Sequence, residues 1–237
     1  SGTGIINRWE EIMSTPRKSS VSSDVICKDL LKRIIHLEYE PGEGISENEL
    51  CEVYGATRHA IRGALAVLRE KGLVEVFPQR GTYVSLIDLK MIDNILFLRE
   101  ALEQETIHEI MKSGDHTELV RKLRECLEKQ KSVDMSEDNA ALFYELDEEF
   151  HRLLLKEIGR ESVLDLYADS YLHVIRWRNM EVTALQRFSY LPEEHKNIID
   201  AIENNDEHKA RVLLGKHIDS VAQFGMEMKE KYPRFFV

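Results

Sequence analysis

The order of helix and strand signals between residues 46 and 86 constrains the fold more than any other feature of this sequence. Ser46, with Glu49 three residues later, is a capping box and predicts the start of a short helix. Gly55 breaks that helix, and Thr57 can cap a second helix whose apolar side chains repeat at helical spacing. Two short helices separated by such a break predict a helix-turn-helix.

The flanking segments extend this unit. Residues 21–36 carry apolar side chains at helical spacing, and the turn signal Pro41-Gly42 follows them. Downstream, the segments LVEVF and TYVSL predict two strands joined by a turn at PQRG. Helix, helix, turn, helix and hairpin is the order of a winged helix-turn-helix, which we place at residues 21–86. The polar residues 1–20 predict a flexible N-terminal arm.

From residue 87 onward the sequence has no convincing strand, and Pro and Gly become scarce. Helical spacing predicts six helices in this part of the chain. They lie near 88–113, 115–132, 137–158, 161–184, 192–204 and 206–231. We therefore expect a mainly α protein in which residues 87–237 form an all-helical second domain.

The composition excludes two classes of protein. Hydrophobic residues make up 43% of the chain and charged residues 32%, as in a soluble globular protein, and no apolar run is long enough to span a membrane. The three cysteines, Cys27, Cys51 and Cys126, are widely spaced and odd in number. This pattern argues against a disulfide framework and for a reducing, cytoplasmic setting, without a membrane partner.

The net charge of -11 is unusual for a protein that binds nucleic acid, but it is unevenly distributed. Residues 1–86 hold 11 of the 32 Lys and Arg and 12 of the 43 Asp and Glu, so the N-terminal part is nearly neutral. A nearly neutral domain can present one basic face to phosphate. The acidic remainder is not expected to touch nucleic acid.

The second helix of the helix-turn-helix offers side chains suited to the major groove of DNA. Arg58 and Arg62 are four residues apart and share one face, and Arg can donate two hydrogen bonds to a guanine. The alternative is a solvated helix face, which two arginines alone would favour, but the capping box, the break and the hairpin together favour DNA binding. The candidate DNA contacts are Thr57, Arg58, His59 and Arg62 on the helix, and Arg80, Gly81 and Thr82 at the tip of the wing.

The second domain contains a candidate metal site. Asp147 and His151 lie one helical turn apart, and His195 and His217 lie on two later helices. One carboxylate and three imidazoles would suit a divalent ion such as Zn²⁺, Ni²⁺ or Mn²⁺. The spacing alone leaves a second interpretation open, because an Asp and a His four residues apart are more often a surface pair.

The residues 41–50 (PGEGISENEL) and 54–84 (YGATRHAIRGALAVLREKGLVEVFPQRGTYV) resemble the winged helix-turn-helix of GntR-type bacterial regulators. The resemblance implies that Arg58, Arg62, Arg80 and Gly81 contact an operator. Two positions depart from the family pattern. Gly63 stands where the family usually has Glu, which lowers helix propensity, and His59 stands where Pro or Thr is common, which leaves the operator sequence open.

The second domain is similar to the FCD effector domain of FadR-type GntR regulators. The similarity rests on the D-x-x-F-H segment ending at His151, on the EH pair at His195 and on the later His217. It implies an antiparallel helical bundle with a cavity, in which Asp147 and these three histidines bind a divalent metal, Zn²⁺ or Ni²⁺. Six helices rather than seven place the chain nearer the shorter, VanR-like group.

The resemblance also implies an effector. Arg99 matches an arginine on the first bundle helix of the family, and its planar guanidinium suits the carboxylate of a small organic acid. The competing interpretation is an ion pair with Glu103, four residues later on the same helix.

Together these features predict a homodimeric repressor that binds palindromic double-stranded DNA and responds to a carboxylate at the metal. A metal-free dimerisation bundle is one alternative. A metalloenzyme fused to a winged helix is another, and against it stands the lack of an identifiable nucleophile or general base such as an H-E-x-x-H motif provides.

Overall fold

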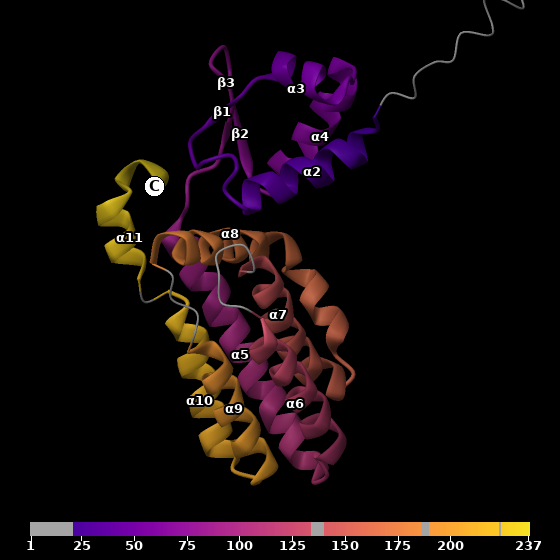
Figure 1. The fold of residues 1–237 in the computed structure, drawn as a ribbon, viewed down its shortest axis with the longest axis vertical. Helices are drawn as coiled ribbons and strands as arrows, with labels where there is room; N and C mark the ends of the chain where they lie inside the picture. The colour runs from indigo at the N-terminus through magenta and orange to yellow at the C-terminus, as the bar shows by residue number, and fades with distance from the viewer. Residues whose placement is uncertain (1–20, 134–139, 186–189, 223) are drawn as a thin grey trace, which may run out of the picture.

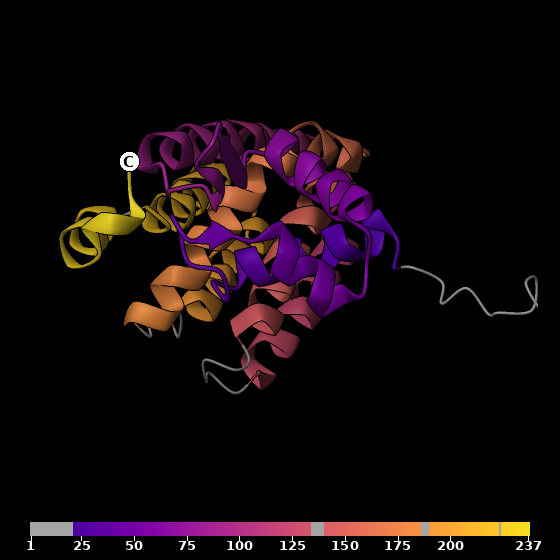
Figure 2. The ribbon, with the colours of Figure 1, turned by 90° about the horizontal axis from the view of Figure 1, so that it is seen from above.

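The computed structural model describes residues 21–133, 140–185, 190–222 and 224–237. The predicted N-terminal arm, residues 1–20, lies outside this described part. A small N-terminal unit rests on one end of a bundle of long helices, and the view from above places it over that end (Figures 1 and 2). None of the helices in the described residues is sufficiently long and apolar to cross a membrane.

The N-terminal unit has the predicted winged helix-turn-helix order. Its helices are α2 (Ser23–Ile35), α3 (Glu47–Tyr54) and α4 (Arg58–Glu70), and its strands are β1 (Gly44–Ile45), β2 (Val74–Phe77) and β3 (Gly81–Val84). The three strands form an antiparallel sheet in the order β1-β3-β2. The sequence predicted β2 and β3 but not β1, because a strand of two residues is too short to show an alternating pattern.

Local capping explains why these helices begin and end where they do. The Ser46 hydroxyl accepts a hydrogen bond from the Glu49 amide at 3.3 Å, and the Thr57 hydroxyl accepts one from the Ala60 amide at 3.3 Å. Gly55 ends α3 with a φ of 58°, in the left-handed region that favours glycine. The predicted break and both predicted starts are therefore confirmed.

Gly63, which departs from the family pattern, has a packing role. A Cβ atom at this position would lie 2.7 Å from the Ser23 hydroxyl oxygen, because α2 crosses α4 there. The glycine thus permits close contact between the two helices, at the cost of helix propensity.

The second domain is the predicted helical bundle, with two of the six helices interrupted. Its long helices are α5 (Leu89–Ser113), α6 (Thr117–Ser132), α7 (Ala140–Glu157), α8 (Ala168–Leu185), α9 (Leu191–Glu203) and α10 (Glu207–Ser220). The predicted helix 161–184 divides into a 3₁₀ helix, η2 (Glu161–Leu166), and α8. The predicted helix 206–231 divides into α10 and α11 (Gly225–Lys231), and η3 (Pro233–Phe235) follows. Residues 137–139 of the predicted third helix lie outside the described residues.

Helix α8 joins the bundle to the winged domain. His173, Arg176 and Asn179 follow at intervals of three residues, so they share one face of α8. The Arg176 guanidinium donates to the Ser85 and Leu86 carbonyls at 2.9 and 3.0 Å. Asn179 donates to the carbonyl of Ile35, the last residue of α2. His173 pairs with the carbonyl of Lys71, the residue that caps the C-terminal end of α4. The bundle therefore contacts the carbonyl ends of two winged-domain helices.

The C-terminal residues hold the connection between the two domains. Ile87 forms a parallel bridge with Phe236, its amide donates to the Phe235 carbonyl at 2.8 Å, and its carbonyl accepts from the Val237 amide at 3.2 Å. The Phe236 ring also packs against Trp177 of α8, with 6.2 Å between ring centroids. The connection is thus ordered by the end of the chain as well as by α8.

Candidate metal centre and DNA-binding surface

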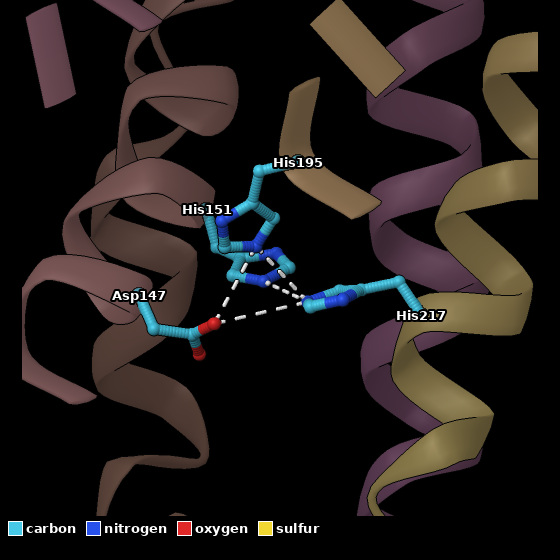
Figure 3. A group of neighbouring side chains, drawn as sticks. All are labelled: Asp147, His151, His195 and His217. Carbon is cyan, nitrogen blue, oxygen red and sulfur yellow. Dashed lines mark hydrogen bonds and ion pairs between the residues drawn. The ribbon is translucent and has the colours of Figure 1, made fainter. Parts of the chain in front are cut away.

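The four predicted metal ligands come together inside the bundle (Figure 3). Asp147 and His151 project from successive turns of α7, His195 from α9 and His217 from α10. Each side chain is at most 2% exposed, and one ligand atom from each lies within 4.8 Å of all the others. This rules out the interpretation of Asp147 and His151 as a surface pair.

The Nε2 atoms of the three histidines face a common point. The distance from His217 Nε2 is 3.1 Å to His151 Nε2 and 3.2 Å to His195 Nε2. Asp147 Oδ1 lies 3.4 Å from His195 Nε2 and 3.8 Å from His217 Nε2. These spacings bring four potential donors of electron pairs around one small volume.

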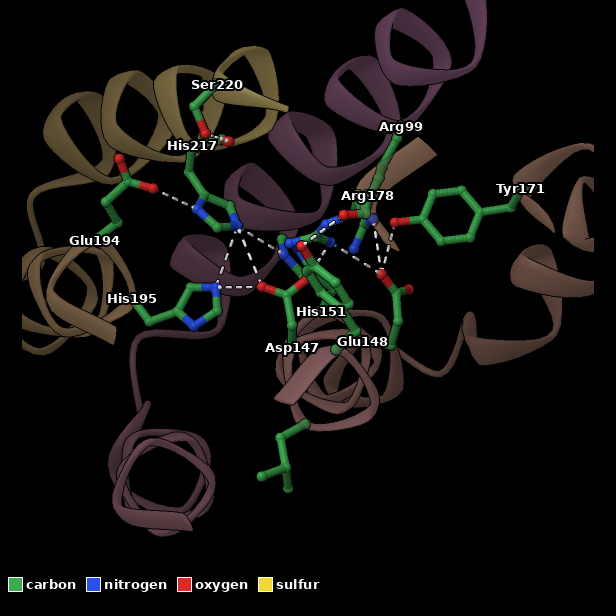
Figure 4. Close-up of polar contacts among 12 residues, drawn as sticks. Arg99, Asp147, Glu148, His151, Tyr171, Arg178, Glu194, His195, His217 and Ser220 are labelled. Atoms are coloured by element: carbon green, nitrogen blue, oxygen red, sulfur yellow. Dashed lines mark hydrogen bonds and ion pairs between the residues drawn. The ribbon is translucent and has the colours of Figure 1, made fainter. Parts of the chain in front are cut away.

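An outer layer of acceptors orients the three rings, and Figure 4 shows one of them, Glu194 beside His217. Each Nδ1 atom faces an acceptor oxygen: Glu103 beside His151, Gln130 beside His195 and Glu194 beside His217. The distance from His195 Nδ1 to Gln130 Oε1 is 2.8 Å, and so is the distance from His217 Nδ1 to Glu194 Oε2. A neutral imidazole that donates through Nδ1 leaves a lone pair on Nε2. Carboxylate or amide partners of this kind accompany most metal-binding histidines.

The three Nε2 atoms and Asp147 Oδ1 are better suited to bind a divalent cation than to contact one another directly. Three Nε2 lone pairs that face each other repel unless a cation or a proton lies between them. Asp147 Oδ1 is buried and has no hydrogen-bond partner within the described residues, and a buried unpaired carboxylate oxygen is costly. A cation at the common point would satisfy all four atoms, so this cluster could hold a metal ion.

The charges around the cluster keep its groups in metal-binding form. Burial alone would raise the pKa of Asp147, but the buried guanidinium of Arg178, which bonds its Oδ2, and the neighbouring histidines hold this pKa well below its usual range. Burial, together with the other histidines, lowers the pKa of His195 and of His217. Both directions favour the forms that bind a metal, an ionised carboxylate and neutral imidazoles.

Arg99, the predicted effector ligand, lies beside the cluster but already has partners. Its Nε donates to Glu103 at 2.7 Å and its Nη1 to Glu148 at 3.0 Å, and its guanidinium lies over the Tyr171 ring. Burial alone would raise the pKa of Glu103, but His151 and Arg99 lower it to about 2. The intrahelical pair that competed with the effector role is thus present, and an effector carboxylate would have to share Arg99 with two acidic side chains.

A cavity of about 390 Å³ opens between the two domains, and its lining includes none of the four cluster residues. Its bundle wall includes Tyr144, Glu148 and Arg178, and its winged-domain wall is Ile35 and His36 at the end of α2. Arg178 borders both places, because it lines the cavity and also bonds Asp147. Pockets of this size with a few polar groups on apolar walls commonly bind small molecules.

The predicted DNA-contacting side chains of α4 are exposed together at its N-terminal end. Thr57, Arg58, His59 and Arg62 are all exposed. Arg58 Nη2 donates to Asn48 Oδ1 at 2.8 Å, and Arg62 Nε donates to both carboxylate oxygens of Glu47. The sequence did not predict either partner, because both lie on the preceding helix and are fixed only by the angle between α3 and α4.

The wing presents one cation at its tip. The turn is tight, with left-handed φ values of 64° at Gln79 and 110° at Gly81, and it leaves Arg80 exposed over the ring of Phe77. Thr82, in contrast, is only 8% exposed, because it lies within β3 between β1 and β2. This burial leaves little of the Thr82 side chain at the candidate DNA surface, and a direct contact between Thr82 and DNA stays a prediction.

The chain joins a winged helix-turn-helix, with exposed arginines on its second helix, to a helical domain with a buried polar cluster. This combination is typical of a DNA-binding transcription regulator. Known proteins agree. Residues 22–84 match the gntR family of bacterial regulatory proteins, and residues 94–220 match the FCD domain. The chain therefore belongs to the GntR family and carries an FCD domain.

Individual relatives support the same assignment. An HTH-type transcriptional regulator of Streptomyces ambofaciens is 31% identical over 90% of this chain and 88% of that protein. The HTH-type transcriptional repressor RspR of Escherichia coli is 24% identical over 89% of this chain and 92% of its own length. A GntR regulator from Rhodococcus shares the fold with a TM-score of 0.67 at 20% identity, over 86% of this chain and 97% of its own.

Proposed function

We propose that this chain is a homodimeric repressor whose affinity for a palindromic operator is controlled by a small carboxylate at a metal site in the FCD domain. The observation that carries this proposal is the convergence of three oriented Nε2 atoms and of the buried Asp147 Oδ1, which accepts no hydrogen bond within the described residues. Two named relatives, RspR and the NanR protein of Enterobacter, are described as repressors, which supports that direction of control. As a regulator of bacterial DNA, the chain would act in the cytoplasm.

Asp147, His151, His195 and His217 would hold the metal. Zn²⁺ and Ni²⁺ suit this donor set best, since imidazole nitrogen is a good ligand for both, and Mn²⁺ is a third candidate. When bound, the ion would supply a positive centre for an effector carboxylate. Glu103, Gln130 and Glu194 would keep the imidazoles oriented, and Arg178 would keep Asp147 ionised.

We propose that the effector occupies the cavity beside Arg178, with Arg99 as a second cation nearby. The cavity touches the end of α2, so a molecule there would contact the winged domain as well as the bundle. Arg178 is on α8, the helix whose Arg176 and Asn179 hold the winged domain. An effector that draws Arg178 would therefore shift a helix that positions the DNA-binding surface. The effector would bind one arrangement of the winged domains, either the one that binds the operator or the one that does not, more tightly than the other. This difference in affinity would set the change in operator affinity.

The dimer is supported by an apolar surface on α5. Phe97 and Leu98 are 73% and 50% exposed, and such large neighbouring apolar side chains are typical of an interface. A two-fold dimer would place two recognition helices one DNA turn apart, as a palindromic operator requires.

Operator binding with and without metal tests this proposal. A duplex selected from random DNA would be titrated with metal-loaded protein, with chelated protein and with the Asp147→Ala and His217→Ala variants. Hydroxy acids, sugar acids and dicarboxylates would be added in turn. We expect one class of acid to weaken operator binding about tenfold, and to do so only in the metal-loaded wild type.

Two other results would favour the alternatives. If no acid changes the affinity and no metal is retained, the FCD domain serves as a metal-free dimerisation bundle. If an acid is turned over and the turnover depends on Asp147, the second domain is a metalloenzyme.

A further inference from the structure

The recognition arginines are held by the first turn of the neighbouring helix α3. Arg62 Nε donates to both oxygens of Glu47, at 3.1 and 2.9 Å, while the Arg62 side chain remains 66% exposed and that of Glu47 31%. Arg58 is held in the same way by Asn48. Glu47 is the first residue of α3, where the helix dipole favours a carboxylate.

We propose that Glu47 is a positioning residue that determines the specificity of DNA reading by Arg62. This inference rests on the proposed contact between Arg62 and a DNA base. Glu47 does not touch the DNA in this proposal. It acts through Arg62, by fixing the plane of the guanidinium and by excluding phosphate from it.

The first effect follows from the donors of arginine. A guanidinium has one N–H on Nε and four on its two terminal nitrogens. Glu47 uses the Nε donor, so the terminal nitrogens remain for the paired bonds to guanine O6 and N7. A side chain that is already oriented loses less conformational freedom on binding than a free surface arginine does.

The second effect follows from charge. Arginine binds phosphate as readily as it binds guanine, and phosphate contacts carry no sequence information. A phosphate that approaches Arg62 also approaches the Glu47 carboxylate, and the two anions repel. A guanine edge bears only partial charges, so it meets much less repulsion. Glu47 therefore favours base contact over phosphate contact at this arginine.

The chain offers a matched control in Glu49, another carboxylate in the first turn of α3, which is exposed. The variants Glu47→Gln and Glu49→Gln remove the same charge from the same helix end, and Gln at position 49 retains a capping-box residue. Each would be titrated with a duplex selected from random DNA and with an unselected random duplex, at several salt concentrations. Thermal unfolding would confirm that both variants fold like the wild type.

We expect Glu47→Gln to lower the ratio of selected to random affinity about tenfold, as for the loss of one base contact. Its binding to the random duplex should also become more salt-dependent, because Arg62 gains a phosphate contact. Glu49→Gln should change both affinities by the same factor. Equal changes of the ratio in the two variants would overturn the proposal.

The variant Arg62→Ala separates this inference from the role of Arg62 itself. In the Arg62→Ala background, Glu47→Gln should alter the ratio no more than Glu49→Gln does. An effect that persists there would mean that Glu47 acts without Arg62 and would overturn the inference alone. If Arg62→Ala leaves the selected affinity unchanged, the base contact fails and the inference fails with it.

Discussion

The outer acceptor Glu194 allows a quantitative test of the metal site without removing a ligand. Its Oε2 atom lies 2.8 Å from His217 Nδ1, and its side chain is 34% exposed while that of His217 is 2% exposed. In Glu194→Gln, an amide oxygen can still accept from Nδ1, so the ring keeps its orientation. The substitution removes only the negative charge that makes His217 a stronger ligand.

Loss of an outer partner typically weakens metal binding 10- to 100-fold. Since solvent already screens a carboxylate that is one third exposed, we expect the lower end, a loss of about tenfold or ~1.4 kcal/mol of binding free energy. Competition with a chromophoric chelator for Zn²⁺ and for Ni²⁺ would measure it. His217→Ala, which removes a ligand, should cost more than Glu194→Gln does.

Glu193→Gln is the matched control for this experiment. Glu193 is the preceding residue, also in the first turn of α9, and its 67% exposed side chain lies near Lys196 rather than near a histidine. The metal affinity of this variant should stay within about twofold of the wild type, since exposed charges contribute little. An equal loss in the two variants would show that general charge, and not the bond to His217, governs the affinity, and the reasoning would fail.

Three further predictions concern other parts of the molecule. Arg80→Ala should weaken the selected and the random duplex alike and reduce the salt slope of binding by about one; a loss confined to the selected duplex would instead indicate base contact. Gly63→Ala should bring no net gain in the free energy of unfolding, because its Cβ would meet the Ser23 hydroxyl at 2.7 Å. Adding Ser23→Ala should release about 1 kcal/mol of helix propensity in urea unfolding, and strictly additive effects would contradict this coupling. Phe97→Arg should produce a monomer in sedimentation analysis, and an unchanged dimer would place the interface elsewhere.

Local signals made most of the fold predictable. Ser46, Gly55 and Thr57 act on residues within four positions of themselves, so the sequence indicated both helix starts and the break between them. The interruptions at Tyr167 and before Gly225 were missed, because apolar side chains keep their helical spacing across both. Gly225 itself has a tertiary role, since a Cβ there would lie 3.2 Å from Leu89 of α5.

The candidate site was only half predictable. The four inner groups are recognisable by residue type and by their resemblance to the FCD pattern. Glu103, Gln130 and Glu194 had no such signal, because each meets its histidine only through the packing of two helices. The burial of Thr82 had no such signal either, because this polar residue next to an exposed turn comes to lie between two strands only in the folded sheet.

The metal content of the folded chain tests most directly the central claim, that the buried cluster of Asp147 and three histidines binds a metal ion. Purified protein would be loaded with Zn²⁺ or Ni²⁺, dialysed and analysed for bound metal beside the His195→Ala variant, with circular dichroism to confirm the fold of both. The buried cluster predicts one ion for each wild-type chain and far less in the variant. A wild-type chain that folds and binds DNA but retains no more metal than the variant would contradict it.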